Sequence, residues 1–130
     1  MNELIKHRIE INPEVLSGKA VIKGTRIPVE IILRKLSEGA TEADLLDAYP
    51  RLTVQDIQAI MAYGEATARI VELRQRAAQL AEQYGSIELL AERISAEGVL
   101  ADDHTLYTDL LEWRAVRDEL SKLAGFLESV

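Results

Sequence analysis

The chain contains no cysteine among its 130 residues, which excludes disulfide bonds and zinc sites built from thiolates. Aromatic residues make up only 5% of the composition, and this scarcity favours helices over a large β-sheet. The N-terminal residues lack the apolar stretch of a secretory signal, and no apolar run is long enough to span a bilayer. These absences predict a cytoplasmic, mainly α-helical protein.

Negative charge predominates, with a formal net charge of −7, but it is unevenly distributed. Residues 1–40 hold seven basic and five acidic side chains, whereas residues 41–130 hold eight basic and 17 acidic ones. If the chain binds nucleic acid, the basic patch has to lie near the N-terminus, because the acidic remainder repels phosphates.

A short β-hairpin is predicted near the N-terminus. Residues 8–11 alternate polar and apolar side chains, and residues 20–22 form a second β-branched segment. The two segments pair with each other or offer an edge to a second copy of the chain. Gly18 and Gly24 occupy the predicted turns, because glycine reaches positive φ without a steric cost.

Lys19, Lys23 and Arg26 cluster around these turns. Such a cluster suits phosphates or a carboxylate-rich partner, and the alternative is a basic hairpin that contacts only solvent. Arg26 has a second structural interpretation, in which it bridges a carboxylate or ties the hairpin to a helix end. Pro28 then suits the first turn of the helix that follows.

Three helical segments follow, with clear start and stop signals. The first covers about residues 29–38 and ends at Gly39. Thr41 begins the second with the spacing of a capping box, and Pro50 ends it near Tyr49. Thr53 repeats the same capping spacing, so the second and third segments have helix-turn-helix proportions.

The third helix is expected to continue beyond Gly64, because apolar residues recur there at three- and four-residue steps. Gly85 and Ser86 then suit a C-cap and an N-cap around a turn, with a short helix that ends at Gly98. Asp102 or Asp103 caps a last long helix with the apolar stripe Leu106, Leu110, Trp113, Val116, Leu120, Leu123 and Leu127. The predicted extension is a helical bundle, closed within one chain or across a dimer.

The candidate nucleic-acid-binding residues follow from this arrangement. Five cations are available for phosphates and two amides for adenine edges: Lys19, Lys23, Arg26, Arg34, Arg51, Gln55 and Gln58. The predicted recognition helix over residues 53–63 contains no lysine or arginine and does contain Asp56. The alternative is a helical pair that only packs.

No catalytic, cofactor or metal motif is found, so the sequence predicts no enzyme, no cofactor and no metal site. His7 and His104 belong to no metal-binding pair, and neither a nucleophile elbow nor a phosphate loop occurs. Asp102, Asp103 and His104 are compatible with a metal cluster. The preferred interpretation is that the two acidic residues lie at a helix start, where they suit the macrodipole.

The motif Gly18-Lys19-x-x-Ile22-x-Gly24-Thr25-Arg26-Ile27-Pro28-Val29 is followed by Leu36-x-x-Gly39 and by Tyr49-Pro50-x-Leu52-Thr53-x-x-Asp56-Ile57-x-Ala59. This pattern resembles the bacterial domain-of-unknown-function family numbered 433 over about residues 8–65. The resemblance implies an antitoxin-like, three-helix domain related to helix-turn-helix proteins. We therefore expect an antitoxin-like domain over residues 1–65. The helical pattern of residues 66–130, which the resemblance does not cover, predicts a helical extension that serves dimerisation or partner binding.

By the same resemblance, the expected function is DNA binding for autoregulation together with neutralisation of a PIN-like ribonuclease toxin. Arg114 and Arg117, beside Trp113, are the candidate partner contacts. Trp113 also fits the bundle core, because it lies on the apolar stripe. The alternative function, from another class, is a structural or scaffolding homodimer that binds no nucleic acid.

Self-association is the first testable prediction. An isolated two-stranded hairpin is marginal in water, and an unpaired strand edge invites a second chain. We expect sedimentation equilibrium at micromolar concentration to give about twice the mass of one chain, whereas the mass of a single chain would contradict the prediction. In a dimer, deletion of residues 1–16 tests the strand edge, and truncation after Gly98 tests the helical stripe.

Overall fold

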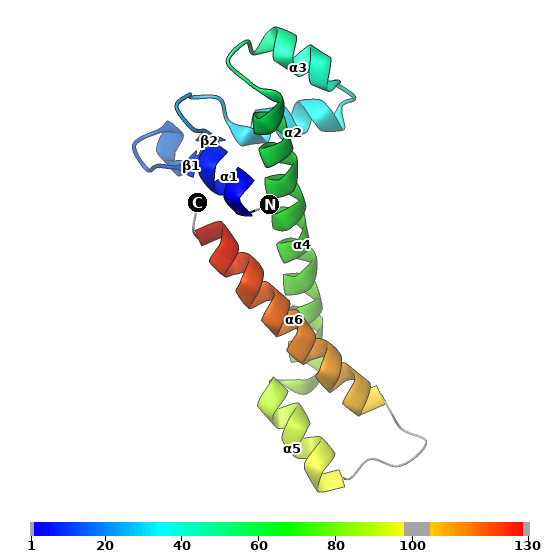
Figure 1. The fold of residues 1–130 in the computed structure, drawn as a ribbon. Helices are drawn as coiled ribbons and strands as arrows, with labels where there is room; N and C mark the ends of the chain where they lie inside the picture. The colour runs from blue at the N-terminus through cyan, green and yellow to red at the C-terminus, as the bar shows by residue number, and fades with distance from the viewer. Residues whose placement is uncertain (1, 98–104, 129–130) are drawn as a thin grey trace. The chain divides into compact units, whose positions relative to one another are not determined.

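The computed structural model describes residues 2–97 and 105–128 of the chain. The elements in chain order are α1 (Asn2–Arg8), β1 (Ile9–Ile11), a short 3₁₀ turn (Leu16–Gly18), β2 (Ala20–Ile22), α2 (Val29–Ser37), α3 (Glu42–Ala48), α4 (Val54–Tyr84), α5 (Ile87–Glu97) and α6 (Thr105–Glu128), as Figure 1 shows. This confirms the mainly α fold with a short N-terminal β-hairpin. Within these ranges no helix has both the length and the apolarity that a membrane crossing requires.

The chain divides into two compact units. The first unit comprises Met1–Thr67 and Phe126–Val130, and the second comprises Ala68–Gly125. The boundary falls inside α4, about two residues beyond the predicted one after residue 65, so this helix contributes its first part to one unit and its last part to the other.

The β-hairpin of the first unit forms as the sequence predicts. β1 and β2 are antiparallel, with Ile9 opposite Ile22 and Ile11 opposite Ala20. Ile9 and Ile22 are buried and place this end of the hairpin on the core. Gly18 has φ +82°, as expected, but the two residues before it, Leu16 and Ser17, also have positive φ, which the sequence did not signal.

α2 and α3 begin and end close to the predicted positions. Pro28 is the N-cap of α2 with extended ψ, so it lies just before the helix and not in its first turn. Gly39 follows α2 with φ +101°. At α3 the Asp44 backbone N–H donates to Thr41 Oγ1 at 3.1 Å, and the Thr41 N–H donates to Asp44 Oδ2 at 2.9 Å. This confirms the predicted capping box.

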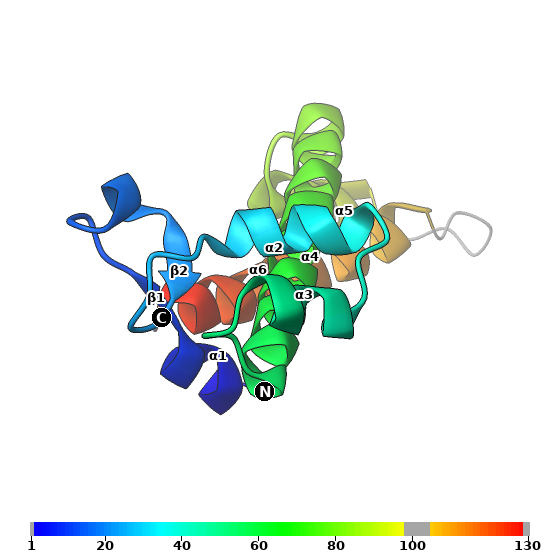
Figure 2. The same cartoon turned by 90° about the horizontal axis from the view of Figure 1, so that it is seen from above.

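α4 continues without a break past Gly64, as the sequence analysis expected. A Cβ at Gly64 would lie 2.8 Å from Leu33 Cδ2, so the missing side chain lets α2 pack closely on α4. α2 crosses this part of α4 in Figures 1 and 2.

The core of the first unit draws on every helix of that unit and on the hairpin. Its most deeply buried side chains are Ile5, Ile9, Val29, Ile32, Leu45, Ile57, Ala59 and Ile60. Ile5 belongs to α1, a helix that the sequence analysis did not predict. Because α1 has only seven residues, its stability depends on this apolar packing rather than on helix propensity.

The second unit contains the end of α4, α5 and most of α6. Its core comprises Leu80, Ile87, Leu90, Leu110 and Trp113. Gly85 ends α4 with φ +88°, and the Leu89 N–H donates to Ser86 Oγ at 3.1 Å, so both predicted caps around this turn are confirmed. The helix end predicted at Gly98, the caps predicted at Asp102 or Asp103, and His104 lie outside the described residues.

A second capping box begins α4, where the Thr53 N–H donates to Asp56 Oδ2 at 3.0 Å and the Asp56 N–H donates to Thr53 Oγ1 at 3.1 Å. The two boxes, at α3 and at α4, allow a stability prediction. Asp56 is 6% exposed and also accepts a hydrogen bond from Arg8, whereas Asp44 is exposed and makes its cap contacts alone. We expect Asp56→Ala to lower the free energy of unfolding of the first unit by about 2 to 3 kcal/mol, because a cap and a charged hydrogen bond are lost together. Asp44→Ala is the matched control and should cost clearly less.

Urea unfolding followed by circular dichroism measures both losses. Fluorescence of Trp113, the only tryptophan, reports on the second unit and should be unchanged by either substitution. Equal losses of unfolding free energy for Asp56→Ala and Asp44→Ala would show that the hydrogen bond from Arg8 adds nothing to stability.

Candidate nucleic-acid interface

The turn between β2 and α2 presents two cations because Thr25 closes it. Thr25 Oγ1 donates to the Ile22 carbonyl at 2.7 Å and accepts from the Ile27 N–H at 3.1 Å. Gly24 allows the turn with φ +79°. The side chains of Lys23 and Arg26 are left exposed, and neither has an ion pair within the described ranges. The exposed position of Arg26 does not support the interpretation in which it bridges a carboxylate.

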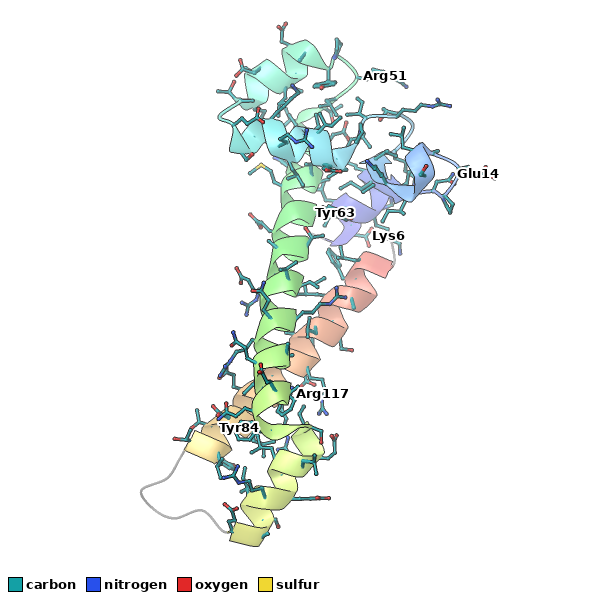
Figure 3. The ribbon with its side chains drawn as sticks, turned by 180° about the vertical axis from the view of Figure 1, so that it is seen from behind. Lys6, Glu14, Arg51, Tyr63, Tyr84 and Arg117 are labelled. Carbon is teal, nitrogen blue, oxygen red and sulfur yellow. The ribbon has the colours of Figure 1, made fainter. Side chains whose placement is uncertain are left out.

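Arg51 joins a second turn to this one. It follows α3, in the connection to α4, and its Nη2 donates to the Gly24 carbonyl at 3.0 Å. Arg51 is labelled in Figure 3 beside the α3–α4 turn. The bond uses one side of the guanidinium and leaves the side chain exposed, so Arg51, Lys23 and Arg26 gather at the start of α4.

Arg8 completes this arrangement, although the sequence analysis did not single it out as a site residue. Its Nη1 donates to Asp56 Oδ1 at 3.0 Å and to Thr53 Oγ1 at 3.3 Å, and its carbonyl accepts from the Lys23 N–H at 2.8 Å. Arg8 thereby neutralises the one buried carboxylate at the head of α4. No local sequence signal identifies this contact, because its two ends are 48 residues apart.

The exposed face of α4 beside these cations is uncharged over its first two turns. Gln55 and Gln58 are exposed, together with Val54 at 38% and Met61 at 48%. The predicted amide pair therefore lies on an accessible surface, while Ile57 and Ile60 point into the core. This arrangement can present amides to base edges while the cations of the two turns contact phosphates.

Lys19 and Arg34 lie apart from this group. Lys19 precedes β2, at the opposite end of the strand from Lys23, and is exposed. Arg34 lies on α2 and forms an exposed ion pair with Glu30 at 3.6 Å. The structure thus joins the turn of Lys23 and Arg26 to Arg51, just before the helix that carries Gln55 and Gln58. Lys19 and Arg34 lie outside this group.

The three candidate partner residues lie on α6 in the second unit. Trp113 is 7% exposed and packs in the core with Leu80 and Leu110, which agrees with the core interpretation. Arg114 is exposed, and Arg117 lies 4.0 Å from Glu88 in an exposed pair. Trp113 is therefore buried below the surface, while Arg114 and Arg117 are accessible to a partner protein.

Two ion pairs join α4 to α6 within the second unit. Arg69 Nε donates to Glu119 at 2.8 Å, and Arg76 makes a two-nitrogen contact with Glu112, of which Nη2 to Oε2 is 3.0 Å. The hydrogen bond from Arg76 lowers the pKa of Glu112, and that from Arg69 lowers the pKa of Glu119. Both carboxylates are therefore ionised at neutral pH.

A shallow pocket of about 280 Å³ lies along these ion pairs, between Arg69, Arg76, Glu112 and Ala115. Its charges are already paired with one another. Across the described ranges, no three His, Cys, Asp or Glu side chains are placed to hold a metal ion.

Comparisons with known proteins concern the first half of the chain. Residues 9–64 match the family described as "Protein of unknown function (DUF433)", which confirms the resemblance expected over residues 8–65. The "Uncharacterized protein y4eO" of Sinorhizobium fredii (strain NBRC 101917 / NGR234) is 33% identical over 55 residues, which are 42% of this chain and 25% of that protein. The chain thus covers about a quarter of the length of this curated relative.

A solved structure also matches about half of the chain. It is the crystal structure of a DUF433 member protein from Anabaena variabilis ATCC 29413, with 38% sequence identity and a TM-score of 0.44. The match covers 48% of this chain and 62% of that one.

Proposed function

We propose, from the match of residues 9–64 to the family described as DUF433, that the chain is a non-enzymatic, antitoxin-like protein of the cytoplasm. In this proposal the first unit binds DNA, which allows autoregulation. The second unit binds and neutralises a PIN-like ribonuclease, and the chain acts as a homodimer.

The observation that carries the DNA-binding part is the contact between Arg51 and Gly24. This 3.0 Å hydrogen bond brings the cations of two separate turns to the start of α4. The exposed amides of Gln55 and Gln58 follow on the helix itself. A second helix that follows a short turn, with cations at its N-terminal end, is the geometry by which helix-turn-helix proteins enter a major groove.

DNA binding by the first unit depends on how its charged side chains are distributed. Residues 9–64 contain six basic and eight acidic side chains, so attraction to phosphates depends on where the charges lie. Several of the acidic ones are on α3 and its cap, whereas Arg8 neutralises Asp56 at the head of α4. The two-fold dimer that is part of this proposal would double the group formed by Lys23, Arg26 and Arg51.

The scaffolding homodimer is the second candidate function, and a specific observation favours it. The first part of α4 has no basic side chain before Arg69. A DNA-binding protein normally obtains much of its affinity from phosphate neutralisation, so the two turns have to supply all of it.

DNA binding is tested with the exposed pair Lys23 and Arg26. We expect the wild-type protein to shift a DNA fragment from upstream of its own coding sequence at low and moderate salt. Lys23→Ala with Arg26→Ala should weaken binding about tenfold or more and reduce the salt slope by about 2 per protomer, because two phosphate contacts are lost. Electrophoretic shift and fluorescence anisotropy measure both quantities.

Arg93→Ala with Lys122→Ala is the matched control, since it removes two exposed cations from the second unit. It should leave DNA affinity unchanged. If the wild-type protein gives no shift even at low salt, the scaffolding homodimer becomes the better explanation.

Toxin neutralisation is tested by co-expression with the product of the adjacent gene. We expect a PIN-like ribonuclease to co-purify with the full-length chain and its RNA cleavage to be suppressed in the complex, because a bound partner blocks access to the nuclease site. Size-exclusion chromatography with light scattering gives the stoichiometry. If neither complex formation nor suppression is observed with any adjacent gene product, this part of the proposal is wrong.

A further inference from the structure

One face of the second unit combines exposed arginines with exposed aliphatic side chains. Its residues lie on α4 and α6, and we name this surface the arginine face: Val71, Arg74, Ala78, Leu111, Arg114 and Arg117. Of these, only Arg114 and Arg117 are predicted from the sequence as partner contacts. Arg117 is labelled in Figure 3.

The ion pairs between the two helices fix which residues share this face. Arg69 pairs with Glu119 and Arg76 with Glu112, so each step of seven residues along α4 matches seven residues backward along α6. In this antiparallel register Arg74 is level with Arg114.

Both arginines also lie on the same side of the helix pair. Arg74 directly follows the buried Leu73, and Arg114 directly follows the buried Trp113. In two antiparallel helices, residues that follow core positions by one lie on one side, whereas residues that precede them lie on the other. Glu112 precedes Trp113, and the paired ladder accordingly occupies the side opposite the arginine face.

Arg74 and Arg114 are exposed and unpaired. Among the described residues, neither guanidinium makes an ion pair or a hydrogen bond, and Asp118, one turn beyond Arg114, is not joined to it. By contrast, Arg69, Arg76 and Arg93 each contact a carboxylate, and Arg117, on the same face, lies 4.0 Å from Glu88. In a unit with seven basic and eleven acidic residues, two neighbouring cations without partners form a local positive patch.

Aliphatic side chains lie on both sides of this patch along the helices. Val71 is 54% exposed, and Ala78 lies seven residues further along α4, about 10 Å away. Leu111, 49% exposed, lies near the level of Ala78 on α6. Along α4 the order is aliphatic, basic and aliphatic, with a repeat of two helical turns, and Arg117 lies on α6 near the level of Val71.

These features select the kind of partner. An amphipathic helix with apolar residues seven apart and carboxylates between them matches both the spacing and the charge of the arginine face. A second copy of the chain docked on the same face would bring arginines against arginines. Nucleic acid is disfavoured because acidic residues predominate in the rest of the unit.

We propose that the arginine face binds an acidic amphipathic helix of a different protein. This inference deepens the partner-binding part of the proposed function and rests on it. It adds Arg74 to the binding residues and specifies the chemistry of the segment that the partner supplies.

The test uses the full-length protein and a labelled synthetic peptide of about 20 residues. The peptide has leucines at helical positions i, i+3 and i+7 with glutamates between them, and a second peptide has the same composition in scrambled order. We expect the protein to bind the ordered peptide at least tenfold more tightly than the scrambled one in fluorescence anisotropy. Arg74→Glu with Arg114→Glu should abolish this preference.

Arg93→Glu with Lys122→Glu is the matched control, because it changes the net charge equally on exposed positions outside the face. It should bind the ordered peptide as the wild-type protein does. Circular dichroism and Trp113 fluorescence confirm that both double variants keep the fold of the second unit. Equal binding of the two peptides, or full binding by Arg74→Glu with Arg114→Glu, would overturn the proposal.

Co-expression with the adjacent gene product separates this proposal from the function on which it rests. Loss of the complex only in Arg74→Glu with Arg114→Glu supports both. A complex that survives this double substitution leaves toxin neutralisation intact and refutes the arginine face as its site. Selective peptide binding without any complex supports the face and refutes neutralisation.

Discussion

The carboxylate of Asp56 is the interaction on which the first unit depends. It closes the N-terminus of α4 through the Thr53 N–H and accepts a hydrogen bond from Arg8 at the end of α1. The Arg8 carbonyl in turn receives the Lys23 N–H, so one buried acid links α1, the β2–α2 turn and α4. Because a buried carboxylate is costly without partners, these elements are stable only when they come together.

The same linkage explains how an acidic chain can present a basic surface. Arg8 is used to neutralise Asp56, and Arg51 is anchored to the Gly24 carbonyl. Lys23 and Arg26 remain exposed beside them, and the uncharged start of α4 adds amides instead of further cations. The proposed DNA contact therefore depends on turn geometry more than on the composition of the helix that would enter the groove.

In the second unit, charge separates two faces of one helix pair. Carboxylates of α6 satisfy Arg69 and Arg76 on one side, and this ladder sets the antiparallel register. On the other side, neither Arg74 nor Arg114 makes an ion pair within the described part of the chain, whereas Arg117 lies 4.0 Å from Glu88. Trp113, directly before Arg114, belongs to the buried core of the second unit together with Leu80 and Leu90.

The sequence by itself determined the features that depend on neighbouring residues. Thr41 and Asp44, Thr53 and Asp56, Gly39 and Gly85 act within one helical turn, and their predicted helix boundaries are confirmed. Only the tertiary structure decided the rest. α1 is too short to form without the core that Ile5 enters, and Arg8 reaches Asp56 across 48 residues. The grouping of Arg51 with Lys23, and of Arg74 with Arg114, likewise arises from contacts between distant segments, which no local pattern encodes.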